Sequence, residues 1–133
     1  MKTSFPSLHK TFYQSLDDWL QKNSRKSKKA VYVVKSKTPV PRVLKIDKGG
    51  ILYVGETSDF TDRVGKLVNA MNGTELRKHD AGDDYFRLLS KVYKLNNVSI
   101  EVIFTSDHNR IETQLLQQYL NKFGELPPLN RKG

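Results

Sequence analysis

The segment from Ile51 to Met71 constrains the fold most, because it predicts a strand, a turn and a helix in immediate succession. The apolar run Ile51 to Val54 is typical of a short strand, and Gly55 marks the turn after it. Ser58 is the predicted N-cap of the helix, and two aspartates follow where the helix dipole favours acids. The apolar residues of the helix recur with the helical period; they are Phe60, Val64, Leu67, Val68 and Met71.

Arg63 lies at the edge of this apolar face, one turn after Phe60 and one turn before Leu67. Two interpretations are open. The aliphatic part of Arg63 can cover the apolar surface while its guanidinium reaches water. Alternatively, the guanidinium points over a sheet at an anion, because its planar fork suits phosphate better than a lysine does. The rest of the chain has to decide between them.

Composition predicts one domain, because 133 residues with 37% hydrophobic content are enough for a modest core. No apolar run approaches the ~20 residues of a membrane span, and the N-terminus lacks the continuous apolar core of a signal peptide. We therefore expect a cytoplasmic protein with no membrane partner. The absence of cysteine excludes disulfides and thiolate zinc sites, and three widely spaced histidines argue against an all-histidine metal site.

The chain is strongly basic, with 23 lysines and arginines against 14 acids and a formal net charge of +9. Such a charge favours partners that carry phosphate, although many proteins carry it only as a solvated face. The basic residues crowd the stretches 22–29 and 35–48. From charge alone, a nucleic-acid partner and a solvated basic surface both stay open.

The chain divides into an N-terminal segment, 1–29, and a main domain, 30–133. Residues Ser7 to Gln21 predict an amphipathic helix that either covers the core or binds a partner, and a basic linker follows it. The apolar face of this helix consists of Leu8, Phe12, Leu16, Trp19 and Leu20.

For the main domain we expect an α+β fold, with a small, three-stranded, largely antiparallel sheet flanked by helices. The predicted strands are Ala30 to Val34, Ile51 to Val54 and Val98 to Thr105. Tyr32 and Tyr53 come out on one side of this sheet if the register allows it. The Pro- and Lys-rich stretch between the first two strands predicts at most a short edge strand over 43–46.

Two further helices are predicted, over Tyr85 to Tyr93 and over Asp107 to Phe123. On the second helix, Glu112 lies on or beside the face that must pack. An acid that reaches solvent or an ion pair explains a glutamate there, because burial without a partner is costly. A functional acid is the other interpretation. The prolines near the end of the chain lay Leu129 and Asn130 back across the domain.

The motifs AVYVV and LYVGET, an arginine on the next helix, a glutamate on a late helix and an asparagine after prolines together resemble the GIY-YIG nuclease family. Ala30-Val31-Tyr32 stands where that family has G-I-Y, and Tyr53-Val54-Gly55 stands where it has Y-I-G. Arg63 matches the helical arginine of the family, Glu112 its metal-binding glutamate and Asn130 its late asparagine. The resemblance covers most of the chain.

The chain departs from the family pattern at three places. Ala30 replaces the glycine of the first triplet, and 20 residues separate Tyr32 from Tyr53, more than we expect for compact members. Leu67 stands where several members carry a histidine. His79 is a candidate to serve in its place, and the alternative is an ordinary surface histidine.

The resemblance implies hydrolysis of DNA phosphodiester bonds with one divalent metal ion, Mg²⁺ or Mn²⁺. Glu112 would hold this ion, and water and phosphate oxygens would complete its ligands. Arg63 would stabilise charge on the phosphorus, Tyr32 would act as general base or position water, and Tyr53 would orient water or phosphate. Asn130 is expected to hold the site in place.

The predicted contacts with DNA are Lys28, Lys29, Lys45, Lys48, Lys66, Arg77, Lys78 and Arg131. Such contacts should weaken steeply with salt. One metal ion cuts one strand, so double-strand cleavage needs a homodimer or successive nicks. RNA as the substrate stays open. So does a rival function, a non-catalytic module on the same fold that binds nucleic acid or a partner protein.

Overall fold

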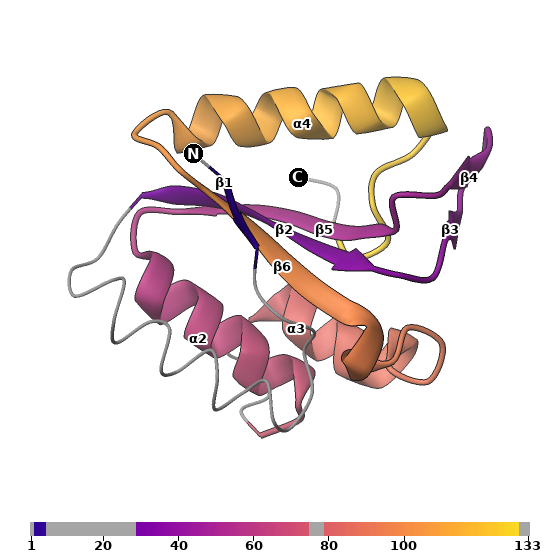
Figure 1. Ribbon diagram of the computed structural model, residues 1–133, viewed down its shortest axis with the longest axis horizontal. Helices are drawn as coiled ribbons and strands as arrows, with labels where there is room; N and C mark the ends of the chain where they lie inside the picture. The colour runs from indigo at the N-terminus through magenta and orange to yellow at the C-terminus, as the bar shows by residue number, and fades with distance from the viewer. Residues whose placement is uncertain (1, 5–28, 75–78, 131–133) are drawn as a thin grey trace.

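Three strands rich in β-branched residues form the centre of the sheet, in a computed structural model that describes residues 2–4, 29–74 and 79–130. These strands are β2 (Ala30–Ser36), β5 (Ile51–Thr57) and β6 (Val98–Phe104). β2 lies between the other two and pairs antiparallel with both, which leaves β5 at one edge of the sheet (Figure 1). The α+β class and the three antiparallel strands are as predicted.

A fourth strand, β1 (Lys2–Ser4), pairs antiparallel with β6 and forms the other edge. Three polar residues give no apolar alternation, so the sequence analysis did not predict this strand. The start of the N-terminal segment therefore adds to the sheet of the main domain. The helix predicted over Ser7 to Gln21 and the basic linker up to residue 28 lie outside the described residues.

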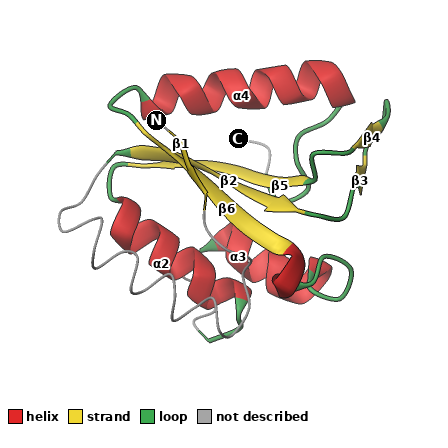
Figure 2. Cartoon of the chain, viewed as in Figure 1, coloured by secondary structure: helices red, strands yellow, loops and turns green. Residues whose placement is uncertain are grey.

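Helices cover both faces of the sheet (Figure 2). On one face lies α4 (His108–Phe123), which ends at Gly124 as predicted; the φ of 81° there is the left-handed conformation of a helix cap. On the other face lie α2 (Phe60–Met71) and α3 (Asp80–Asp84), and a short 3₁₀ turn, η2 (Leu95–Asn97), leads into β6. No helix in the described part of the chain is long and apolar enough to cross a membrane.

The helix predicted over Tyr85 to Tyr93 has different bounds in the structure. It begins earlier, as α3, and continues as the π-helical turn η1 (Tyr85–Leu89). His79 is its N-cap, because Nδ1 of His79 accepts a hydrogen bond from the Gly82 backbone N–H at 3.3 Å. The prediction was wrong because the first turn of this helix is polar and resembles a loop.

The apolar face of α2 packs under the sheet, and all of its predicted apolar residues are buried. They share one core cluster with Ala30, Tyr32 and Val34 of β2. The N-cap of α2 is Asp59 and not the predicted Ser58, since the Asp59 carboxylate accepts from a backbone N–H in the first turn. Serine and aspartate cap helices about equally well, so the sequence did not separate them.

Residues 40–47 form a separate antiparallel ribbon and not an edge strand of the main sheet. Its strands are β3 (Val40–Pro41) and β4 (Ile46–Asp47). The turn between them is closed by a hydrogen bond from the Arg42 N–H to the Lys45 carbonyl at 3.2 Å. The ribbon lies at the end of the sheet beside the C-terminal end of α4 (Figure 1).

Candidate active site

The register of β2 and β5 brings two tyrosines together on the face that α2 and α3 cover. Tyr32 lies opposite Gly55, and Tyr53 lies opposite Val34. The two rings therefore share one face of the sheet, with centroids 5.9 Å apart. Tyr32 is fully buried, whereas Tyr53 is only partly buried. The register of the two strands, which the sequence alone did not determine, therefore places both tyrosines on one side of the sheet.

Gly55 allows the two tyrosine rings to meet. A Cβ atom at this position would lie 2.6 Å from both Cζ of Tyr32 and Cε2 of Tyr53, far closer than carbon atoms pack. β5 continues through this glycine as far as Thr57. The predicted turn at Gly55 is therefore wrong, and the glycine is required by close packing.

His79 joins the tyrosines from the N-terminus of α3. Its Nε2 lies 3.1 Å from the Tyr32 hydroxyl, and both groups are buried. A backbone N–H can only donate, so the bond from Gly82 makes Nδ1 of His79 an acceptor. A neutral His79 then carries its proton on Nε2, and this N–H donates a hydrogen bond to the Tyr32 oxygen. Burial also excludes the ordinary surface histidine that the sequence left open.

Burial, and then the positive charge of Arg63, lower the pKa of His79 from 6.5 to about 3. His79 is therefore neutral at neutral pH. In the unfolded chain it binds a proton near pH 6.5, whereas in the folded protein it resists protonation down to about pH 3. Its effect is that the folded protein loses stability as the pH falls through this window.

We expect His79→Asn to flatten this pH dependence, because asparagine also caps helices but does not titrate. Between pH 6.5 and about 4, the free energy of unfolding of the wild-type protein should fall faster than that of the variant, by up to ~1.4 kcal/mol for each pH unit. Urea unfolding at several pH values measures both curves. Parallel curves would contradict a neutral, buried His79.

Burial raises the pKa of Tyr32 well above 10, and the neighbouring Tyr53 adds to the rise, while Arg63 lowers it. Burial also raises the pKa of Tyr53, against the effects of a hydrogen bond with Tyr32 and of the Arg63 charge. The two tyrosine hydroxyls share a hydrogen bond, and Arg63 bonds to both of them. A chain of hydrogen bonds therefore joins Gly82, His79, Tyr32 and Tyr53.

Tyr53, Arg63 and Glu112 line one pocket of about 320 Å³, to which Asn130 also contributes. These residues come from β5, α2 and α4, so the pocket joins the two helical layers at the β5 edge of the sheet. Arg63 and Glu112 are both half-buried. Tyr32 and His79 lie behind Tyr53, with which both make ring contacts.

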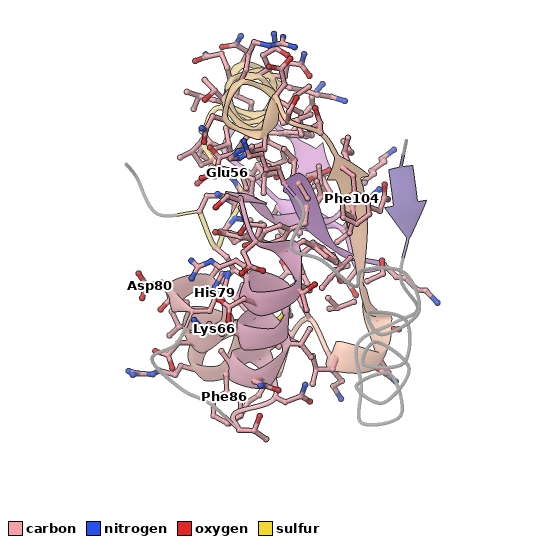
Figure 3. All side chains as sticks on the ribbon, turned by 90° about the vertical axis from the view of Figure 1, so that its left-hand side faces the viewer. Glu56, Lys66, His79, Asp80, Phe86 and Phe104 are labelled. Atoms are coloured by element: carbon pink, nitrogen blue, oxygen red, sulfur yellow. The ribbon has the colours of Figure 1, made fainter. Side chains whose placement is uncertain are left out.

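Burial raises the pKa of Glu112, and the negative charge of Glu56 adds to the rise, while His108 lowers it. Glu56 itself contacts His108, with 2.5 Å between its Oε1 and Nδ1 of the histidine. Figure 3 shows Glu56 between the sheet and α4. Neither Glu56 nor His108 stands out in the sequence as a site residue, although strand alternation places Glu56 on the face opposite to Tyr53.

Two carboxylates line the pocket, Glu112 of α4 and Asp80 of α3. Figure 3 shows Asp80 beside His79, on the α2 side of the sheet. Within the described ranges, no three His, Asp or Glu side chains are placed to hold a metal ion by themselves. A divalent ion held by so few carboxylates would need water and phosphate oxygens as its other ligands, which Mg²⁺ accepts. Asp80 does not stand out in the sequence as a site residue, because the residues around it resemble a polar loop.

Asn130 fixes the edge of β5. Its Oδ1 accepts a hydrogen bond from the Val54 N–H at 2.9 Å, and its Nδ2 donates to the Val54 carbonyl at 2.8 Å. The preceding Leu129 N–H donates to the Leu52 carbonyl at 2.9 Å. Leu129 and Asn130 together therefore hold the backbone on either side of Tyr53.

The basic residues predicted to contact DNA are placed differently. Lys29, Lys45 and Lys48 are exposed. Lys66 is half-buried and forms an ion pair with Asp62, one turn earlier on α2, at 3.0 Å. The others lie outside the described residues; they are Lys28, Arg77, Lys78 and Arg131.

Comparison with models of known protein families, with curated proteins and with solved structures finds no match to this chain. The candidate site therefore rests on the geometry of its residues and on the motifs that they form.

Proposed function

We propose that this protein is an endodeoxyribonuclease of the GIY-YIG type, which hydrolyses DNA phosphodiester bonds with one divalent metal ion. The observation that supports it best is the single pocket lined by Tyr53, Arg63 and Glu112. Each residue alone has an ordinary surface explanation. Their convergence on one pocket at the edge of the sheet, from three elements distant in the sequence, supports a shared function.

Arg63 binds the phosphate in this proposal. Its planar fork matches two phosphate oxygens, and its charge offsets the negative charge that builds up on phosphorus as water attacks. Tyr53 donates a hydrogen bond to the phosphate or to the attacking water. The pKa of Tyr53 is raised above 10, chiefly by burial, so its hydroxyl keeps its proton at neutral pH.

Tyr32 has a supporting role in this proposal, in place of the general base that the family resemblance implies. Its phenol is buried and its pKa lies well above 10, so it is a poor proton acceptor at neutral pH. It accepts a hydrogen bond from His79 and shares one with Tyr53. Tyr32 therefore orients the tyrosine that faces the substrate.

Glu112 would hold the divalent ion, and the carboxylate of Asp80, which lines the same pocket, could supply a further oxygen. Bound Mg²⁺ or Mn²⁺ supplies positive charge at the phosphate and lowers the pKa of coordinated water. The raised pKa of Glu112 reflects burial and repulsion from Glu56. A cation beside Glu112 relieves that repulsion, which supports a role for this carboxylate as a ligand.

Cleavage of supercoiled plasmid tests the proposal. With Mg²⁺ or Mn²⁺ the wild-type protein should nick the plasmid, and removal of the metal with EDTA should stop the reaction. Glu112→Gln should lower the rate by about a hundredfold or more, because it removes the charge that holds the ion. Glu101→Gln is the matched control: it alters an acid of β6 that pairs with Lys35 at 2.9 Å, and it should cleave like the wild type.

A non-catalytic nucleic-acid-binding module is the second candidate, and the complete burial of Tyr32 favours it. Such a protein would bind DNA with a strong salt dependence and would not nick plasmid with either metal. Competition between duplex DNA and structured RNA in the binding measurement distinguishes the two nucleic acids as partners.

A further inference from the structure

The ribbon β3–β4 is fixed against the end of α4. The Leu44 N–H donates to the Phe123 carbonyl at 3.1 Å, and the Val43 N–H donates to Oε2 of Glu125 at 2.9 Å. Arg42 forms an ion pair with the same Glu125 at 3.0 Å. These contacts hold the turn of the ribbon and leave the side chains of Val43 and Leu44 largely exposed.

Asp47 anchors the other strand of the ribbon. Its buried carboxylate accepts hydrogen bonds from the backbone N–H groups of Gly49 and Ile51 at 2.9 and 3.0 Å. It also accepts one from the Tyr119 hydroxyl of α4 at 2.8 Å. Because this carboxylate is satisfied inside the protein, the position of the ribbon does not depend on a ligand. Residues 40–47 therefore form a fixed arm, which we call the ribbon arm (Figure 1).

The tip of the ribbon arm is apolar and exposed. The side chains of Val43, Leu44 and Ile46 are 71%, 64% and 56% exposed. Part of Leu44 packs near Gly124, whereas Val43 and Ile46 are available to a partner. A fixed arm that presents neighbouring apolar side chains to water is typical of a binding surface.

Three lysines accompany this tip. Lys45, Lys48 and Lys122 line one cleft of about 310 Å³ between the ribbon arm and α4. Lys45 and Lys122 lie over the Phe123 ring, at 5.9 and 5.3 Å from its centroid, which keeps their charges beside the cleft. Among the residues that the structure describes, no carboxylate forms an ion pair with any of the three. Asp47 also lines the cleft, but its carboxylate is held by Gly49, Ile51 and Tyr119. Three lysines against one carboxylate leave the cleft suited to an anion.

We propose that the ribbon arm grips duplex DNA, with the lysines of the cleft on backbone phosphates and Val43 and Ile46 against base edges in the major groove. The major groove admits a two-stranded β-ribbon, and apolar side chains there can contact thymine methyl groups. An apolar protein partner would explain the tip but not the three lysines. The charge complementarity therefore selects the nucleic acid.

This inference rests on the proposed function and places the duplex beside the proposed active site. A pocket lined by Arg42 of the ribbon arm shares Leu126 and Asn130 with the pocket that holds Glu112. A duplex seated on the arm can thus run along the β5 edge towards Arg63. The arm supplies affinity, and the pocket supplies the chemistry.

Binding without cleavage tests the inference. Fluorescence anisotropy in EDTA measures the Kd for a labelled short duplex and for its single strand at several salt concentrations. Val43→Ser combined with Ile46→Ser should weaken duplex binding about tenfold with an unchanged salt dependence, because apolar contacts release no counterions. Replacing Lys45, Lys48 and Lys122 with glutamine should lower the slope of log Kd against log salt by about 0.9 for each phosphate that a lysine no longer neutralises.

Leu88→Ser combined with Val92→Ser is the matched control, because these residues are 72% and 62% exposed and belong to the segment after α3. Neither residue belongs to the ribbon arm or to its lysine cleft, so this control should bind duplex like the wild type. Melting temperatures equal to that of the wild type show that the variants are folded. Unchanged duplex affinity in the folded Val43→Ser, Ile46→Ser variant would overturn the inference.

The plasmid assay separates this inference from the proposed function. Suppose that the wild-type protein cuts plasmid and that the Val43→Ser, Ile46→Ser variant binds duplex and cuts normally. This result would contradict DNA binding by the ribbon arm and would support the proposed nuclease activity. Suppose instead that the wild-type protein never cuts plasmid but that its duplex binding depends on the ribbon arm as described. This result would support DNA binding by the arm and would contradict the proposed nuclease activity.

Discussion

Arg63→Ala should lower the rate of DNA cleavage by about a thousandfold. Among the described residues that line the active-site pocket, Arg63 is the only cation, so no neighbour can replace its charge at the phosphate. Its side chain is half-buried at the edge of the apolar face of α2, so its removal should leave the fold intact. Single-turnover cleavage of a labelled duplex, with protein in excess, measures the chemical step separately from binding.

Two further variants define what Arg63 contributes. Arg63→Lys keeps the positive charge but loses the planar fork, so its rate should lie between those of the wild type and of Arg63→Ala. Arg110→Ala removes an exposed arginine that pairs with Asp107 at 2.7 Å, and it should cleave nearly as fast as the wild type. An equal loss in Arg110→Ala would mean that total charge matters and the position of Arg63 does not.

Gly55→Ala should lower the free energy of unfolding by about 2–3 kcal/mol and should also abolish most of the cleavage. The added Cβ would lie 2.6 Å from Cζ of Tyr32 and 2.7 Å from its hydroxyl oxygen, so the ring has to move. Tyr32 is packed on all sides and bonded to His79, so the movement disturbs the core and the site together. Urea unfolding measures the first effect, and plasmid cleavage measures the second.

Gly65→Ala is the matched control for this substitution. Gly65 lies in the interior of α2, and a Cβ there would meet no atom within 4 Å. Alanine is the better helix former, so this variant should gain up to ~1 kcal/mol in the free energy of unfolding. If both glycine variants lose the same stability, steric conflict with the tyrosine rings is not the cause at Gly55.

The sequence predicted those elements whose pattern repeats over several turns or strand positions. The apolar period from Phe60 to Met71 identified α2 and its buried face, and the apolar runs identified β2, β5 and β6. The same reasoning placed Arg63 and Glu112 at the edges of packed faces. It could not say that both face one pocket, because that depends on β5 being the edge strand.

The features that the sequence did not predict depend on contacts between distant residues. β1 is held by backbone pairing with β6, which leaves no trace in its side chains. The start of α3 depends on a histidine cap, a type of cap that residue preferences do not favour. Glu56 and His108 become partners only when α4 packs on the sheet, so neither residue stands out alone.

The amide of Asn130 limits how copies of the protein can associate through the edge of the sheet. It occupies both backbone groups of Val54 on the outer rim of β5, and Leu129 occupies the carbonyl of Leu52. An open rim of this kind invites the strand of a neighbouring molecule to extend the sheet. Here the tail of the same chain already fills those positions. Two copies of the protein are therefore expected to associate through surfaces other than this part of β5.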